Sequence, residues 1–394
     1  MSENLQQQTQ PAAAPAAPAA PAAPKPAPAP TPAPQADKLI VSSSPHYHTK
    51  STVSSIMQWV IISLLPACAA GVWFFGWDAL RVLIITTLAA VGFEALSSFG
   101  MKRELQLKDY SAVVTGILLA MNLPSNTPWW ICIIGSFVAV VIGKMIYGGI
   151  GCNPFNPALV GRVALLLAFP AVMTTWPVPR SCCNDAPAQE MVQQVETSAT
   201  PAAGGVITGA TPLKFSKEAR KNNNARDLMT SIAPKGQEPL NYWKLALGCG
   251  KGGSLGETCS LALLLGGILL ICLNIIRWHV PVCYLGTVAL ITGIAWIANP
   301  AAYADPLFHF LTGGLMLGAF FMATDMVTTP LSRTGSVIFA VGCGVITAAI
   351  RLWGNYPEGV SFSILIMNAF TPLIDRYTAG KPFGMPRTKG VKLS

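Results

Sequence analysis

The feature that most constrains this chain is a recurring apolar stretch long enough to cross a lipid bilayer. A helix needs about 20 mainly apolar residues to span the hydrocarbon core, and the sequence supplies such stretches repeatedly. Hydrophobic residues make up 52% of the chain, charged residues 11%, and the mean hydropathy is +0.48. In soluble domains about a quarter of residues are charged. The sequence therefore predicts an all-α integral membrane protein.

Ten spans are expected, in two groups of five that a polar segment separates. They lie near residues 56–76, 80–99, 111–123, 129–147, 158–176, 255–276, 280–298, 307–323, 336–353 and 361–374. The third and tenth are short, so broken or re-entrant helices that line a cavity are the alternative there. An odd number of spans in each half inverts the second half relative to the first, so two inverted five-helix repeats are expected.

These spans divide the chain into five regions. They are a disordered Pro/Ala-rich tail (1–37), a first transmembrane half (38–176), an extracytoplasmic loop (177–254), a second transmembrane half (255–376) and a basic cytoplasmic tail (377–394). The composition of the first tail favours an extended, polyproline-like chain and supplies no core.

Basic residues are distributed unequally between the two sides of the expected membrane domain. With the N-terminus inside, the inner loops and ends hold Lys38, Lys50, Lys102, Arg103, Lys108, Lys144, Arg162, Arg277, Arg333, Arg376, Lys381, Arg387, Lys389 and Lys392, whereas the short outer loops and their flanks hold Arg81 and Arg351. Lysine and arginine concentrate on the cytoplasmic side of membrane proteins. Both termini are therefore expected in the cytoplasm, and the net charge of +9 needs no nucleic-acid partner.

The polar segment contains a run of small residues that ends in a threonine and a proline. Gly204, Gly205 and Gly209 lack a Cβ, so another macromolecule can approach the backbone closely. Pro212 holds Thr211 in an extended conformation. The Thr211 hydroxyl is thus expected to be an accessible attachment point, and the alternative is an ordinary Ser/Thr turn.

The sequence Thr208-Gly209-Ala210-Thr211 resembles the flavinylation motif, Asp-x-x-Ser/Thr-Gly-Ala-Thr/Ser, of the D subunit of Rnf ion-translocating oxidoreductases and of the B subunit of Na⁺-translocating NADH:quinone reductases. The motif's Asp is Gly205 in this chain. The resemblance runs from about Leu39 almost to the C-terminus. It implies FMN joined through its phosphate to Thr211, with Thr208, Gly209, Ala210, Pro212 and Leu213 around it, and a urea-transporter-like scaffold.

The connection between the fourth and fifth expected spans carries a second candidate site. Asn153 and Asn156 offer amide donors and acceptors, and Arg162 offers a planar fork of donors, which are groups that the N–C=O edge of an isoalloxazine needs. The alternative is a glycine-proline turn with Arg162 as an interfacial anchor. The stretch from Asn153 to Arg162 also resembles an Rnf and quinone-reductase signature, which implies a second, non-covalent flavin of the riboflavin type.

Two acidic residues are candidates for an ion path. Glu94 lies within the second expected span, where a charged side chain costs about 2.5 to 3.5 kcal/mol unless it is paired or neutralised. A role in helix packing is the alternative. Asp325 lies at the end of the eighth span, where it takes part in cation handling, caps the helix or pairs with Arg333.

Other kinds of site find less support. The sequence contains no Walker A loop and no H-E-x-x-H motif, so no catalytic residues are expected in this chain alone. The ten cysteines include no C-x-x-C, and no metal site is expected. The pair His46 and His48 is more typical of a polar loop than of a metal site. A disulfide among Cys182, Cys183 and Cys249 stays open.

The resemblance therefore implies a flavin-carrying membrane subunit that passes electrons between partner subunits. The whole complex is then expected to couple electron transfer between ferredoxin and NAD to the movement of Na⁺ or H⁺. The expected partners are the other Rnf subunits, of types A, B, C, E and G, a flavin transferase and membrane lipid, with no nucleic acid. The expected location is the bacterial inner membrane. The alternatives are a flavin-free inverted-repeat transporter or channel, a purely structural membrane subunit, and a protein like the B subunit of the quinone reductase.

Overall fold

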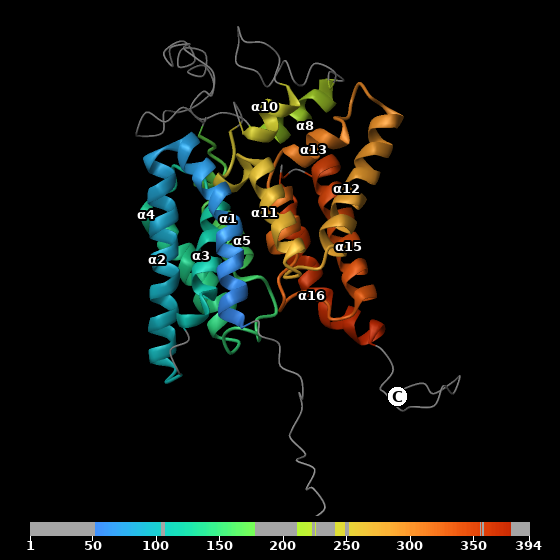
Figure 1. Cartoon of the computed structure of the whole chain (residues 1–394). Coiled ribbons are helices and arrows are strands. Elements are labelled where there is room, and N and C mark those ends of the chain that lie inside the picture. The colour runs from blue at the N-terminus through green and yellow to red at the C-terminus, as the bar shows by residue number, and fades with distance from the viewer. Residues whose placement is uncertain are drawn as a thin grey trace, which may run out of the picture. The chain divides into compact units, whose positions relative to one another are not determined.

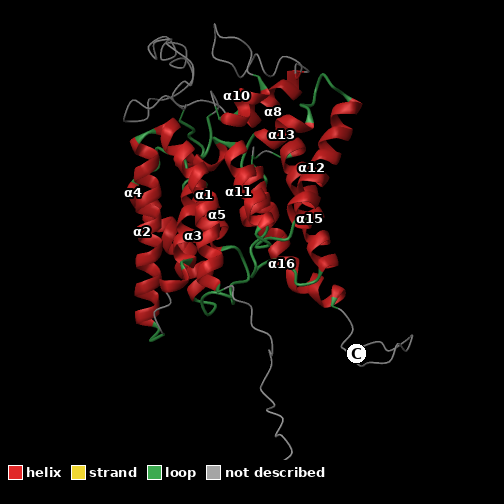
Figure 2. Cartoon of the chain, in the orientation of Figure 1, coloured by secondary structure: helices red, strands yellow, loops and turns green. Residues whose placement is uncertain are grey.

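The computed structural model describes residues 52–103, 107–177, 211–222, 225, 241–248, 252–354, 356 and 358–379. The chain separates into two compact units, residues 1–50 and 51–394, and all described residues belong to the second. Every element in this described part is a helix (Figure 1, Figure 2). The candidate residues Glu94, Asn153, Asn156, Arg162, Thr211, Pro212, Leu213 and Asp325 are described. Thr208, Gly209 and Ala210, the predicted tail 1–37 and residues 380–394 of the predicted C-terminal tail lie outside the described residues.

The first half of the described chain forms a series of helices. They are α1 (Val53–Phe75), α2 (Trp77–Gly100), the 3₁₀ turn η1 (Leu107–Asp109), α3 (Ser111–Met121), α4 (Trp129–Phe137), which continues as the π-helix η2 (Val138–Met145), α5 (Pro157–Ala168) and α6 (Pro170–Met173). The hydroxyl of Thr52 caps α1 by accepting from the Ser55 amide at 3.2 Å. Gly76, at φ 69°, allows the direct reversal from α1 into α2.

The second half is also helical. Its elements are η4 (Leu255–Glu257), α11 (Ser260–Cys272), α12 (His279–Ala298), α13 (Pro306–Leu311), α14 (Leu315–Leu317), which continues as the π-helix η5 (Gly318–Met322), α15 (Arg333–Trp353) and α16 (Val360–Thr378). The expected span 307–323 is interrupted between Thr312 and Gly314, where Gly313 adopts a φ of 70°.

Two shorter helices come from the segment between the halves. They are α8 (Pro212–Asn222) and α10 (Tyr242–Leu247). Figure 1 shows both beside α13, at the end of the helices opposite to the start of α1 and the end of α16. The segment that carries Thr211 is therefore on the other side of the helical layer from the described ends of the chain.

Hydropathy and length identify the protein as a membrane protein. Four helices, α1, α2, α12 and α15, are long and apolar enough to cross a bilayer, and α3, α4 with η2, α5 and α11 are shorter apolar helices. Each of the ten expected spans coincides with one or more described helices. Large apolar side chains such as Trp73, Leu88 and Ile297 are exposed on these helices, as expected for helices whose outer surface faces lipid.

The two halves pack together through α1 and α11, through α5 and α16, and through η4, which contacts α1 and α3. A continuous apolar core runs through both halves, with Leu64, Leu119 and Phe339 among its fully buried members. Gly256 of η4 lies where an added Cβ would be 2.9 Å from the carbonyl oxygen of Met121 and 2.7 Å from the Leu317 side chain. The end of α3 and α14 thus both pack closely against η4.

Candidate functional site

Thr211 lies immediately before the first residue of α8. Its hydroxyl oxygen accepts from the backbone N–H of Lys214 at 3.3 Å, as an N-terminal cap does. The residue is only 2% exposed, so the prediction of an accessible hydroxyl is wrong for this conformation. The reason is that α8 folds down onto neighbouring helices, which the local sequence does not reveal.

The packing of α8 explains the burial of Thr211. Leu213, at the start of the helix, joins a small apolar cluster with Leu245 of α10 and with Ala304 and Phe308 at α13. Pro212 occupies the first helical position, where its missing N–H leaves no bond unmade. Thr211 is therefore held at the start of a helix that packs on its neighbours.

The basic face of α8 binds the end of α15. The Lys217 amine donates to the carbonyl of Gly354 at 2.8 Å and to that of Tyr356, and Arg220 donates to the carbonyl of Leu352. These carbonyls follow or end a long helix, where partners within the helix are missing and the helix dipole favours positive charge. Burial, together with the nearby Arg220 and Arg351, lowers the pKa of Lys217 to about 8.

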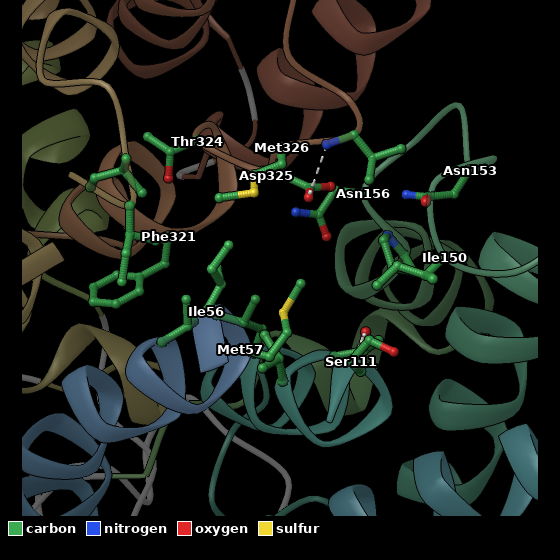
Figure 3. A pocket seen from close by; sticks show the side chains of 18 of the residues that line it. Ile56, Met57, Ser111, Ile150, Asn153, Asn156, Phe321, Thr324, Asp325 and Met326 are labelled. Atoms are coloured by element: carbon green, nitrogen blue, oxygen red, sulfur yellow. Dashed lines mark hydrogen bonds between the residues drawn. The ribbon is translucent and has the colours of Figure 1, made fainter. Parts of the chain in front are cut away.

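A cavity lies between the two halves, near the start of α1 and the end of η5. Its walls come from α1, α3, η2, the 150–157 connection, the end of α11, and η5 with the residues that follow it. Its empty volume is about 790 Å³, counting the part that is open to solvent. Figure 3 shows Asn156 and Asp325, from different halves, extending toward its centre.

The polar groups of this cavity are few and are held by the backbone. The Asn156 amide donates to the carbonyl of Met322 at 3.2 Å while its oxygen caps α5 through the Ala158 N–H at 3.1 Å. Asn153 also lines the cavity and donates to the carbonyl of Phe155 at 3.0 Å. Together with Ser111 and Thr324, these groups place amides and hydroxyls in a mainly apolar space, as ligand-binding pockets do.

Asp325 lines the same cavity just after η5. Its carboxylate accepts from the Val327 N–H at 3.4 Å and from the Thr328 hydroxyl at 3.2 Å. Burial raises the pKa of Asp325, and these hydrogen bonds act in the opposite direction. Among the described ion pairs none joins Asp325 to Arg333, so the expected pairing with Arg333 finds no support.

Glu94 pairs with Lys144, a residue that the basic-residue pattern marked only as a sign of topology. The Lys144 amine lies 2.7 Å from Oε1 of Glu94 and donates to the Ser111 hydroxyl at 2.6 Å. The side chains of Lys144 and Glu94 are 3% and 4% exposed. Lys144 borders the cavity described above, whereas Glu94 borders a separate hollow with Arg103 and Gly148.

Arg162 is buried, and its guanidinium points to a different group of residues. It donates to the carbonyl of Asn122 at the end of α3 and forms an ion pair with Glu358, which precedes α16. It is absent from the described residues that line the cavity of Asn153 and Asn156. The structure thus brings the two asparagines together and places Arg162 in an interior charge cluster.

A glycine-rich stretch lies before α11, and its residues were not among the candidates expected from the sequence. Gly248 to Gly253 and Gly252 to Gly256 match the letters of G-x-G-x-x-G and G-x-S-x-G. Both motifs function between a strand and a helix, and the described residues on either side are helical. Here Ser254 instead donates to the buried carboxylate of Glu257 at 3.0 Å.

The fold and these sites define a helical membrane protein with a cavity, partly open to solvent, between its two halves. A sequence model of the NQR2, RnfD, RnfE family matches residues 40–384. The chain belongs to this family.

Named relatives cover nearly the same length. The chain is 42% identical over 337 residues to the D subunit of the ion-translocating oxidoreductase complex of Stutzerimonas stutzeri, covering 85% of this chain and 93% of that one. It is 41% identical over 353 residues to the D subunit of the Na(+)-translocating ferredoxin:NAD(+) oxidoreductase complex of Acetobacterium woodii, covering 89% and 97%. The corresponding D subunit of Salmonella arizonae is 38% identical over 357 residues, covering 87% and 98%.

Proposed function

We propose that this chain is the flavin-carrying membrane subunit of an Rnf-type complex that couples electron transfer between ferredoxin and NAD to the movement of Na⁺ or H⁺. The names and the nearly full-length match of its relatives support this function. The chain works with other Rnf subunits, for which types A, B, C, E and G are the proposed set. It passes electrons between them and is not catalytic alone.

The observation that carries the proposal is the position of Thr211 at the start of an 11-residue helix. FMN, when joined through its phosphate to this hydroxyl, supplies the redox chemistry. The residues fit a phosphate there because the first N–H groups of a helix and its dipole favour an anion. The Lys214 N–H already points to the Thr211 oxygen. Lys214 is exposed and adds positive charge nearby.

The burial of Thr211 adds an order of events to this proposal. A flavin transferase needs access to the hydroxyl, and the docked α8 encloses it. Attachment therefore precedes the docking of α8 onto α13 and α15, or requires α8 to lift away.

The cavity of Asn153 and Asn156 is the proposed place for a second, non-covalent flavin of the riboflavin type. Its mainly apolar walls and its few amides and hydroxyls fit a planar, partly polar ring. Asn153 and Asn156 would bind its edge, and Asp325 would lie beside it. Arg162 has a role next to this cavity through Asn122 and not as a direct ligand.

Ion movement and membrane orientation complete the proposed function. Glu94 and Asp325 are the proposed ionisable residues of an ion path, because acidic groups at membrane depth are commonly functional. The ten spans form two inverted halves in the bacterial inner membrane, with both termini in the cytoplasm. The place of α8 opposite to the described chain ends supports an outer position for Thr211.

The test is fluorescence of the denatured polypeptide on a gel under ultraviolet light, after production together with its flavin transferase. We expect a fluorescent band that Thr211→Ala abolishes and the neighbouring Thr208→Ala keeps, because covalent flavin alone survives denaturation. A non-fluorescent polypeptide would favour the flavin-free transporter. Normal electron transfer by an assembled complex with Thr211→Ala would favour a structural subunit.

A further inference from the structure

The carboxyl group of the buried Glu257 interacts with that of Glu358, whose side chain is 14% exposed, near Arg162 of α5. Glu257 of η4 is 4% exposed and accepts from the Ser254 hydroxyl at 3.0 Å. Glu358, between α15 and α16, uses one oxygen for the ion pair with Arg162. Its other oxygen, Oε1, is buried without a hydrogen-bond partner. The side chain of Glu257 is within hydrogen-bonding reach of Glu358.

Two arginines lie near the pair, and of the two only Arg162 forms an ion pair with a member of it, Glu358. Arg162 divides its guanidinium between the carbonyl of Asn122 and Glu358. Arg351 of α15 is 3% exposed and donates to the carbonyls of His309 at 2.6 Å and Thr312 at 3.1 Å. In the part of the chain that the structure describes, no cation is ion-paired with Glu257.

This arrangement cannot hold two ionised carboxylates at low energy. A buried carboxylate without a paired cation is strongly disfavoured, and two carboxylates in one site repel each other. Glu358 has its own cation in Arg162, so it is the group that stays ionised. A proton on Glu257 removes the repulsion and supplies the donor that the free oxygen of Glu358 lacks.

We propose that Glu257 and Glu358 form a buried proton-binding site, in which Glu257 is a neutral carboxylic acid that donates a hydrogen bond to Oε1 of Glu358. With this proton bound, the group of Arg162, Arg351, Glu257 and Glu358 keeps one net positive charge. Release of the proton to water leaves the carboxylate and makes the group neutral, so the site stores charge as well as a proton.

The site is connected to the platform that carries Thr211. A Cβ added at Gly313 would lie 2.7 Å from Nη2 of Arg351 and 2.7 Å from the side chain of Leu213, so these two residues meet across this glycine. Leu213 is two residues from Thr211. This connection rests on the proposed function: positive charge under α8 favours a flavin that has gained electrons, and its reduction potential should fall when the proton leaves.

The site is also connected to the interior cavity. Arg162 holds the carbonyl of Asn122, and the Asn122 amide contacts the sulfur of Met322 at 3.7 Å. The carbonyl of Met322 accepts from Asn156, which lines the cavity. A chain of buried polar contacts therefore leads from below α8 to the place proposed for the second flavin.

Infrared spectroscopy of the purified complex at neutral pH tests the proton directly and does not depend on flavin. The spectrum of the unaltered complex minus that of Glu257→Gln should contain the carbonyl band of a protonated carboxylic acid, and this band should move when the sample is transferred to D₂O. Glu218→Gln, on α8, is the matched control and should remove carboxylate bands only.

A Glu257→Gln difference that lacks the protonated carboxyl band and contains carboxylate bands only would overturn the proposal, because it would show that Glu257 is ionised. If Glu257→Gln prevents assembly, Glu257→Asp should shift the protonated band and a difference limited to carboxylate bands would again contradict it. In flavin-loaded complex, the reduction potential of the Thr211 flavin should depend on pH less in Glu257→Gln than in Glu218→Gln. If the reduction potential depends on pH equally in both variants, while Glu257→Gln has lost the protonated carboxyl band, the proton site stands and its link to the flavin is rejected.

Discussion

At the scale of single residues, the protein buries charge in pairs whose members come from distant parts of the sequence. Lys144 and Glu94 are 50 residues apart, and Arg162 and Glu358 are 196 apart. Each pair is almost fully enclosed. The cost of removing such charges from water is recovered only while both partners are present. Buried pairs therefore make these positions sensitive to single changes.

We predict that Lys144→Met destabilises the protein by about 3 to 5 kcal/mol, because it leaves Glu94 buried without its cation. The double variant Lys144→Met with Glu94→Leu should recover most of that loss, since no unpaired charge remains. Unfolding in increasing concentrations of a denaturing detergent, followed by circular dichroism, measures both. A double variant no more stable than Lys144→Met would show that the pair is not the source of the effect.

At the scale of the elements, close helix contact depends on particular glycines. A Cβ added at Gly116 of α3 would lie 2.7 Å from the Cα of Thr87 and 3.2 Å from the Cβ of Ala90, both on α2. Because the first of these atoms belongs to the backbone, the helices themselves would have to move apart. Gly92 of α2 offers a matched control, since an added Cβ there meets nothing within 4 Å.

We predict that Gly116→Ala lowers the free energy of unfolding by about 1 to 3 kcal/mol through overpacking. Gly92→Ala should be neutral or raise it by about 0.5 to 1 kcal/mol, because alanine loses less backbone entropy in a helix. Thermal unfolding of the two variants side by side makes the comparison. Equal stability of both would mean that α2 and α3 adjust their distance freely.

The docking of α8 should depend on pH through Lys217. Its pKa is lowered from 10.5 to about 8 when α8 is docked. Between about pH 8 and 10.5 the undocked lysine therefore holds a proton that the docked one has lost. Docking must then strengthen as pH rises through this window, and the effect is absent below it.

Limited proteolysis within α8 measures this pH dependence. The cleavage rate relative to Lys217→Met, at matched pH, should fall as the pH rises from about 8 to 10.5. The ratio to Lys217→Met removes the pH dependence of the protease itself. A ratio that stays constant, or rises, across this window would contradict the proposed role of Lys217 at the end of α15.

At the scale of the whole molecule, hydropathy predicted where helices form but not how they are broken. Each expected span meets a helix, because apolar runs bounded by Gly, Pro and Asn leave few alternatives in a membrane. The interruption around Gly313 and the π-helices η2 and η5 were not predicted, since they depend on how the helices pack within each half and not on local apolar content.

The sites show the same division between local and long-range information. Asn153 and Asn156 are close in sequence and line one cavity, and Asp325 from the second half lines it too. The pairing of Arg162 with Glu358, and the role of Glu257, depend on which helices meet at the centre. The enclosure of Thr211 depends likewise on the docking of α8.

The proposed function depends above all on a threonine outside the helical layer that carries the flavin through which electrons pass. Mass spectrometry of the peptide that contains Thr211, from protein made together with its flavin transferase, tests this directly. We expect a mass increase equal to FMN minus water, with fragment ions that place it on Thr211. An unmodified peptide from a complex that still transfers electrons normally would show that Thr211 does not carry the flavin.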